Sequence, residues 1–113
     1  MPRRRLPEEF AVVLSQEDDA AVLTVHGDVD LASGPELWDY LDAVLAQNPD
    51  HVVVDLAAVT FIDSVGLNVI VRAYKHMLTT NGHFVLRAPS PNTTRLLEIV
   101  GLADLVKIET AKT

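Results

Sequence analysis

Apolar residues at the start of the chain form two short runs that are separated by polar residues. Residues 10–14 and 20–26 are rich in valine and leucine, and the polar stretch 16–19 lies between them. Short apolar runs on either side of a polar turn are typical of a β-hairpin. We therefore predict that the domain opens with a hairpin.

The next segment carries the signals of a helix start. Ser33-Gly34-Pro35-Glu36 matches a capping box, in which the serine accepts a hydrogen bond at the helix start and the glutamate reaches back. Apolar residues then recur with the 3.6-residue period of a helix, at Leu37, Leu41, Val44 and Leu45. Asn48-Pro49-Asp50 is expected to end this first helix.

Valines 52–54 and Leu56 form a continuous apolar run. This pattern is typical of a central strand that is covered on both faces of a parallel sheet. Residues 57–63 are expected to connect this strand to a second helix over residues 64–80. The apolar face predicted for that helix consists of Leu67, Ile70, Val71, Tyr74, Met77 and Leu78.

The remaining elements continue the alternation of strands and helices. Asn81-Gly82 is expected to end the second helix, and residues 83–86 form another strand. A third, shorter helix starts at Ser90-Pro91, and residues 105–108 form a last strand. The fold class predicted is a single α/β domain over residues 10–113, with a mixed, mostly parallel sheet and helices packed on it. Residues 1–9 are expected to be a flexible N-terminal tail.

The amino-acid composition and net charge limit the classes of molecule that the protein is expected to bind. The chain of 113 residues has 49% apolar residues and a net charge of -7, which disfavours nucleic acid and anionic lipid. Arginines 3–5 are too few for a binding stripe. Because the chain has no cysteine, it offers neither a disulfide nor a thiolate metal site. With no membrane-spanning run and no signal-peptide core, we expect the protein in the cytoplasm.

The loop most favourable for function precedes the second helix. In open parallel sheets, functional groups gather where strands end and helices begin. Here that loop contains Asp63 and Ser64. Local chemistry leaves two interpretations, because Ser64 at a helix start is either a capping residue or a functional hydroxyl. Asp63 is equally explained as a favourable charge at the positive end of a helix.

The wider pattern resembles STAS domains, and in particular the stand-alone anti-sigma factor antagonists of bacteria. The resemblance covers most of the chain. The segments that carry it are Gly27-Asp28-Val29-Asp30, Pro35-Glu36-Leu37, Val53-Val54-Asp55-Leu56, Phe61-Ile62-Asp63-Ser64-Val65-Gly66-Leu67, Pro89-Ser90-Pro91 and Leu97-Glu98-Ile99-Val100-Gly101-Leu102.

This resemblance implies a phosphorylation site at Ser64, modified by an anti-sigma factor that is itself an ATP-dependent kinase. It also implies that Asp30 lies on the partner surface, although a solvated or turn-stabilising carboxylate is the alternative. The other residues that we assign to partner binding are Asp28, Asp63, Ser64, Val65, Gly66 and Asn68. Val65 departs from the family, which usually has serine or threonine there, so affinity or partner choice is expected to differ.

The sequence does not match the enzyme active-site motifs that we compared with it. A nucleophile elbow requires glycine two residues before the serine, where this chain has Ile62. The four histidines lack the spacing of metal ligands, and no phosphate-binding loop is present. We therefore expect no enzyme activity, no metal and no cofactor.

The function expected is that of an anti-sigma factor antagonist. Unphosphorylated protein binds the kinase-type anti-sigma factor and releases the sigma factor, phosphorylation of Ser64 switches binding off, and a phosphatase reverses the modification. We expect a monomer or weak dimer, with no nucleic acid and no membrane as partner. The alternative is a structural STAS module of a signalling scaffold or of a lipid or anion transport system.

Overall fold

Strands β1 (Ala11–Glu17) and β2 (Ala20–Val29) form the predicted hairpin in the computed structural model, which describes residues 9–110. Antiparallel pairing continues as far as Glu17 opposite Ala20, so the turn consists of two residues, Asp18 and Asp19. Asp18 adopts φ 53°, a left-handed conformation that aspartate tolerates in tight hairpin turns. The turn is therefore shorter than the predicted stretch 16–19.

The first helix, α1 (Gly34–Leu45), follows β2. Its buried side chains include the predicted Leu37, Leu41 and Leu45. The predicted capping box is wrong, because Ser33 makes no side-chain hydrogen bond to the helix start. Its hydroxyl instead donates to the backbone oxygen of Asp28 at 2.6 Å.

The central strand, β3 (His51–Ile62), is longer than the sequence suggested. Residues 57–62 were expected to lie in a connection, but they continue the strand and leave only Asp63 between β3 and α2 (Ser64–Thr79). The reason is the length of β2, whose end still pairs in parallel with β3 at Val29 opposite Ile62. Two shifts of register interrupt this pairing, between Thr24 and His26 and between Gly27 and Asp28.

The five strands lie in the order β1-β2-β3-β4-β5, with β1 antiparallel and the others parallel. The predicted mixed sheet and the central position of β3 are confirmed. The remaining elements are β4 (His83–Arg87), α3 (Pro91–Ile99) and β5 (Lys107–Glu109). Asn81 adopts φ 59° just beyond α2, as expected of a residue that ends a helix.

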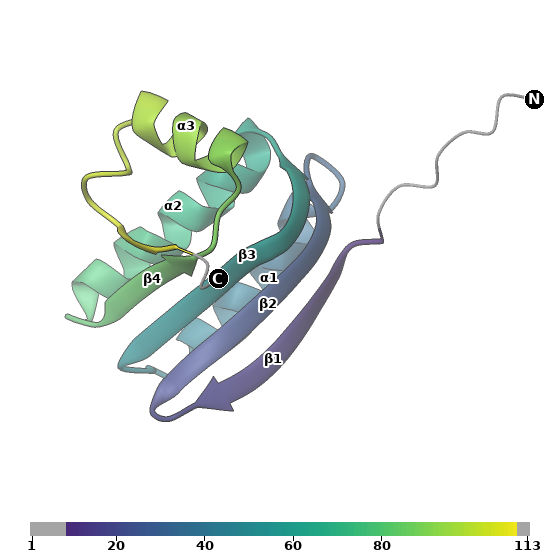
Figure 1. Cartoon of the computed structure of the whole chain (residues 1–113). Coiled ribbons are helices and arrows are strands. Elements are labelled where there is room, and N and C mark those ends of the chain that lie inside the picture. The colour runs from purple at the N-terminus through teal and green to yellow at the C-terminus, as the bar shows by residue number, and fades with distance from the viewer. Residues whose placement is uncertain (1–8, 111–113) are drawn as a thin grey trace, which may run out of the picture.

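Helices α1 and α2 pack on one face of the sheet and lie behind it in Figure 1. The expectation that the central strand is covered on both faces is confirmed, because Val52, Val53 and Val54 are all buried. Val52 and Val54 belong to the core beneath the helices, whereas the side chain of Val53 lies on the opposite face of the sheet and is still only 7% exposed.

Within residues 9–110, no helix is long and apolar enough to cross a membrane. The predicted N-terminal tail falls on residues 1–9, of which residues 1–8 lie outside the part of the chain that is described.

Candidate functional site

The candidate site lies where β2 and β3 end and α2 begins. Asp63 is the N-cap of α2, because its Oδ1 accepts hydrogen bonds from the backbone nitrogens of Val65 at 2.9 Å and Gly66 at 3.1 Å. Ser64 is therefore the first residue of the helix and not its cap. The Ser64 side chain, which the sequence left as a candidate cap, does not cap the helix.

Ser64 is exposed. Within residues 9–110, its hydroxyl forms no hydrogen bond with another protein group. Asn68, one turn further along α2, is also exposed. The start of α2 thus presents a hydroxyl and an amide to solvent while Asp63 satisfies the backbone.

Gly66 and Val65 hold the start of α2 against its neighbours. Gly66 is buried, and a Cβ there would lie 2.8 Å from Val29 Cγ1 and 2.9 Å from the Val29 backbone oxygen. Only glycine permits this approach of the helix to β2. Val65 is half-buried, and a Cβ at Gly34 would lie 2.9 Å from its Cγ1, so the valine packs closely on the start of α1.

Asp30 shapes the turn between β2 and α1. Its Oδ1 accepts hydrogen bonds from the backbone nitrogens of Ala32 at 3.0 Å and Ser33 at 3.1 Å. The Ser33 hydroxyl lies 3.2 Å from the same oxygen. These hydrogen bonds, the one from the Ser33 backbone most of all, hold the pKa of Asp30 below its usual value. Asp30 thus has the turn-stabilising role that the sequence left as an alternative.

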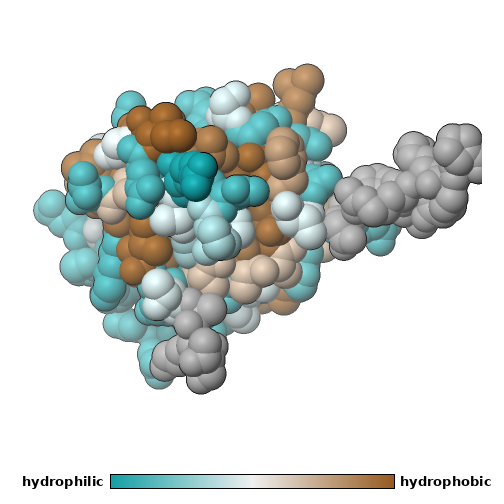
Figure 2. Space-filling view, turned by 45° about the horizontal axis from the view of Figure 1, so that its top comes forward, coloured by the Kyte–Doolittle hydropathy of each residue, from teal (hydrophilic) through white to brown (hydrophobic). Residues whose placement is uncertain are grey.

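Hydrogen bonds connect the two strand ends that carry the predicted residues. The Thr60 hydroxyl on β3 donates to Asp28 Oδ1 on β2 at 2.5 Å. The backbone nitrogen of Asp63 donates to the oxygen of Val29 at 3.1 Å. The structure therefore places Asp28, Asp30, Asp63 and Ser64 on adjoining segments at one end of the sheet. Figure 2 turns this end of the molecule forward and shows apolar and hydrophilic patches alternating on it.

A scan of protein families matches residues 11–112 to the STAS domain. The chain belongs to the STAS domain family. The similarity therefore covers nearly all of the residues that the structure describes.

Relatives of this STAS domain carry names that describe regulators of transcription. It is 31% identical over 96 residues to the anti-sigma-F factor antagonist RsfB of Mycobacterium tuberculosis, covering 85% of this chain and 78% of that one. It is 30% identical over 97 residues to the anti-sigma-B factor antagonist of Bacillus subtilis, covering 86% and 88%. The crystal structure of an anti-sigma factor antagonist from Mycobacterium paratuberculosis superposes with a TM-score of 0.84 at 29% identity, covering 91% and 87%.

Sequence reasoning missed three side chains at this end of the STAS domain. Ser33 ties its own turn to the end of β2 through Asp28, and Thr60 connects the ends of β2 and β3. Leu31 is the most exposed large apolar side chain in the described part of the chain. The position of Leu31 directly after the predicted Asp30 was a usable signal. The hydrogen bond between Thr60 and Asp28 joins residues 32 positions apart, so no local sequence pattern predicts it.

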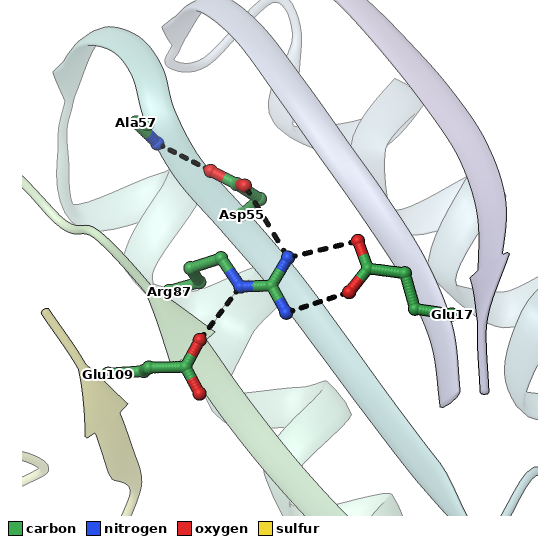
Figure 3. A network of polar contacts seen from close by, with 5 residues as sticks. All are labelled: Glu17, Asp55, Ala57, Arg87 and Glu109. Atoms are coloured by element: carbon green, nitrogen blue, oxygen red, sulfur yellow. Dashed lines mark hydrogen bonds and ion pairs between the residues drawn. The ribbon is translucent and has the colours of Figure 1, made fainter. Parts of the chain in front are cut away.

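A second polar cluster lies on the face of the sheet opposite α1 and α2 (Figure 3). Arg87 on β4 forms hydrogen bonds with Glu17 on β1 at 3.1 and 3.2 Å and with Glu109 on β5 at 2.9 Å. Asp55 on β3 lies 3.9 Å from the same guanidinium. The hydrogen bond and charge of Arg87 lower the pKa of Glu17, and the hydrogen bonds from Arg87 to Glu17 and Glu109 raise the pKa of Arg87.

Within residues 9–110, no three histidine, aspartate or glutamate side chains lie close enough to hold a metal ion. The rings of His51 and His83 stack with their centroids 4.8 Å apart, and Asp19 lies 3.5 Å from His51. These groups come from the β1–β2 turn and from the first residues of β3 and β4, at the opposite ends of those strands from the Ser64 site.

Proposed function

We propose that this STAS domain is an anti-sigma factor antagonist that a kinase-type anti-sigma factor phosphorylates on Ser64. Unphosphorylated protein binds that anti-sigma factor and thereby releases the sigma factor to join RNA polymerase. The observation that carries the proposal is the exposed Ser64 at the first position of α2, with helix capping performed by Asp63. The names of relatives at 31% and 30% identity support the same role.

The modification requires only an accessible acceptor from this chain. The kinase transfers the γ-phosphoryl group of ATP to Ser64 Oγ, so that a new O–P bond forms, the bond to ADP breaks and the hydroxyl proton is released. In this proposal the chain acts by binding and has no catalytic activity of its own. A phosphatase that hydrolyses phosphorylated Ser64 restores the binding form.

Local charge supports a switch that turns binding off. Phosphorylation adds a charge of about -1.5 to -2 at neutral pH. The new group would stand beside Asp63 and near the segment of Asp28 and Asp30, in a chain whose net charge is already -7. Asp63 already occupies the backbone donors of Val65 and Gly66 that would otherwise attract a phosphate to the helix start.

The same charge supports the choice of partner. We propose that the protein acts in the cytoplasm as a monomer or weak dimer and binds protein, without nucleic acid or membrane as partner. A net charge of -7 repels nucleic acid phosphates and anionic lipid, whereas a neutral or basic protein surface complements it.

Substitution of Ser64 tests the proposal. Wild type, Ser64→Ala and Ser64→Asp are each titrated against every kinase-type anti-sigma factor of the source organism, and their thermal midpoints are compared. We expect all three to fold, alanine to bind like wild type without accepting phosphate, and aspartate to bind more weakly. Equal binding of alanine and aspartate, with no phosphate on wild type after incubation with ATP, would reject the switch.

A further inference from the structure

Two apolar side chains flank the Ser64 site and remain exposed. Leu31 is 76% exposed, the largest fraction among the large apolar side chains of residues 9–110, and Phe61 is 54% exposed. Exposure of such side chains forgoes the stabilisation that burial gives. Apolar groups that gather in this way around a polar centre are typical of an interaction surface.

A rigid turn presents Leu31. The backbone nitrogen of Asp30 donates to Ser33 Oγ at 3.0 Å, and that of Gly34 donates to the Asp30 oxygen at 2.7 Å. With the two bonds to Asp30 Oδ1, these hydrogen bonds close the chain on both sides of Leu31. A side chain held on a preformed turn loses less conformational entropy on binding than one on a mobile loop.

Phe61 forms part of the wall of a hollow between the end of β3 and the start of α3. The hollow has a volume of about 190 Å³, and its lining includes Ile62, Asn92, Thr93 and Leu96. Small-molecule sites commonly measure roughly 300–1,000 Å³. The size of this hollow therefore fits a single side chain of a partner better than a separate ligand.

Acidic groups lie between the two apolar features. Asp28 is the register partner of Phe61 across the β2–β3 pair, and Asp30 directly precedes Leu31. Among residues 9–110, no basic side chain forms an ion pair with Asp28, Asp30 or Asp63. A complementary surface would place lysine or arginine between two apolar contacts.

We propose that Leu31 and Phe61 are specificity-determining contacts of the kinase-type anti-sigma factor. Leu31 enters an apolar socket of the kinase, an apolar side chain of the kinase fills the hollow beside Phe61, and basic residues face Asp28 and Asp30. This inference rests on the proposed function and deepens it, because it names the side chains that determine affinity around the acceptor. Ser64 itself contributes the phosphorylation site and little of the binding energy.

The test compares two exposed leucines. Leu31→Ala and Leu105→Ala are titrated against the purified kinase-type anti-sigma factor that binds wild type. Leu105 is a matched control because it is 62% exposed and lies between α3 and β5. We expect the Kd of Leu31→Ala to rise about tenfold or more and that of Leu105→Ala to change less than about twofold. Phosphorylation of Ser64 in Leu31→Ala should slow in proportion when the kinase is below saturation.

The outcomes separate the inference from the function on which it rests. If wild type binds a kinase and Leu31→Ala binds equally well, the assignment of Leu31 is wrong while the proposed function stands. Equal losses for both leucines would show general hydrophobic adhesion and would also reject the inference. If wild type binds none of these kinases, the proposed function fails and the inference fails with it.

Phe61→Ala tests the second contact. Phe61 is half-exposed at the end of β3, so its removal also affects packing. The thermal midpoint of Phe61→Ala is therefore measured together with its affinity for the kinase. We expect the folded fraction of Phe61→Ala to bind the kinase more weakly than wild type does. Asn92→Trp provides a second variant, since Asn92 is exposed on α3 and a large side chain there would obstruct the hollow without removing core contacts. Wild-type affinity in both variants would reject the hollow as a contact.

Discussion

Asp63 and Ser64 have separate tasks although they are neighbours. The carboxylate of Asp63 satisfies two backbone nitrogens at the start of α2, and the hydroxyl of Ser64 is left exposed. A phosphoryl group on Ser64 therefore replaces no hydrogen bond that the structure requires. The proposed phosphorylation of Ser64 is therefore compatible with the fold.

Substitutions at the two positions should differ in their effect on stability. Asp63→Ala removes the cap, so we expect a loss of about 0.5–2 kcal/mol in the free energy of unfolding. Ser64→Ala removes an exposed hydroxyl and should change it by less than about 0.5 kcal/mol. Urea denaturation of both variants measures the difference. A cost at Ser64 equal to that at Asp63 would assign the capping role to the serine.

Asp30 combines a structural role with a proposed contact, and Asp30→Asn separates the two. The amide oxygen of asparagine can still accept from the nitrogens of Ala32 and Ser33, so the thermal midpoint should stay close to that of wild type. Loss of the negative charge should weaken binding to the kinase. Calorimetry and titration on the same preparation measure both properties. Unchanged affinity of Asp30→Asn for the kinase would show that Asp30 has only a structural role in its turn.

At the level of elements, Arg87 connects the edges of the sheet to its centre. Its hydrogen bonds reach β1 through Glu17 and β5 through Glu109, over the face of the sheet opposite α1 and α2 (Figure 3). The three-residue β5 has few backbone hydrogen bonds of its own to hold it. We therefore expect faster hydrogen exchange of β1 and β5 amides in Arg87→Met, with β3 little affected.

The same network predicts a pH dependence. Arg87 lowers the pKa of Glu17 in the folded protein below the ordinary value of 4.5. A lowered folded-state pKa adds stability above pH 4.5, and this contribution is lost as the pH falls through the folded-state pKa. The difference in unfolding free energy between wild type and Arg87→Met should therefore shrink with acid. A difference that stays constant down to full protonation of Glu17 would contradict the ion pair.

Some elements could be predicted from the sequence because their signals are local. Valines 52–54 indicated the central strand, and the 3.6-residue period indicated α1. The second half of β3 was missed because Ala57, Ala58 and Thr60 lack a strong apolar pattern, and pairing with β2 supplies the missing stabilisation. Leu78 was expected on the buried face of α2 and is 55% exposed, since it lies in the last turn of that helix.

The candidate site was predicted only in part. Motif positions placed Asp63 and Ser64 at a helix start, which the structure confirms. The division of tasks between them and the diversion of the Ser33 hydroxyl to Asp28 are local contacts, but they depend on backbone geometry that residue types alone do not specify. The Arg87 network depends on contacts between distant segments. Glu17 and Arg87 are 70 residues apart in the chain, so no local pattern predicts their hydrogen bonds.

At the level of the whole molecule, the proposed functional groups gather at one end of the sheet. The carboxyl ends of β2 and β3 carry Ser64, three aspartates and two exposed apolar side chains. A net charge of -7 adds a general preference for a basic partner surface. In the proposed function, a single phosphoryl group at that end would therefore change the charge with which the protein meets a basic partner surface.

The most direct test of this account is the affinity of one preparation before and after modification. Wild-type protein is titrated against its kinase-type anti-sigma factor, then phosphorylated by that kinase with ATP, verified by intact mass and peptide mapping, and titrated again. We predict a single phosphate on Ser64 and a loss of affinity of about a hundredfold or more, which phosphatase treatment reverses. A phosphate on another residue, or equal affinity of the two forms, would contradict the account.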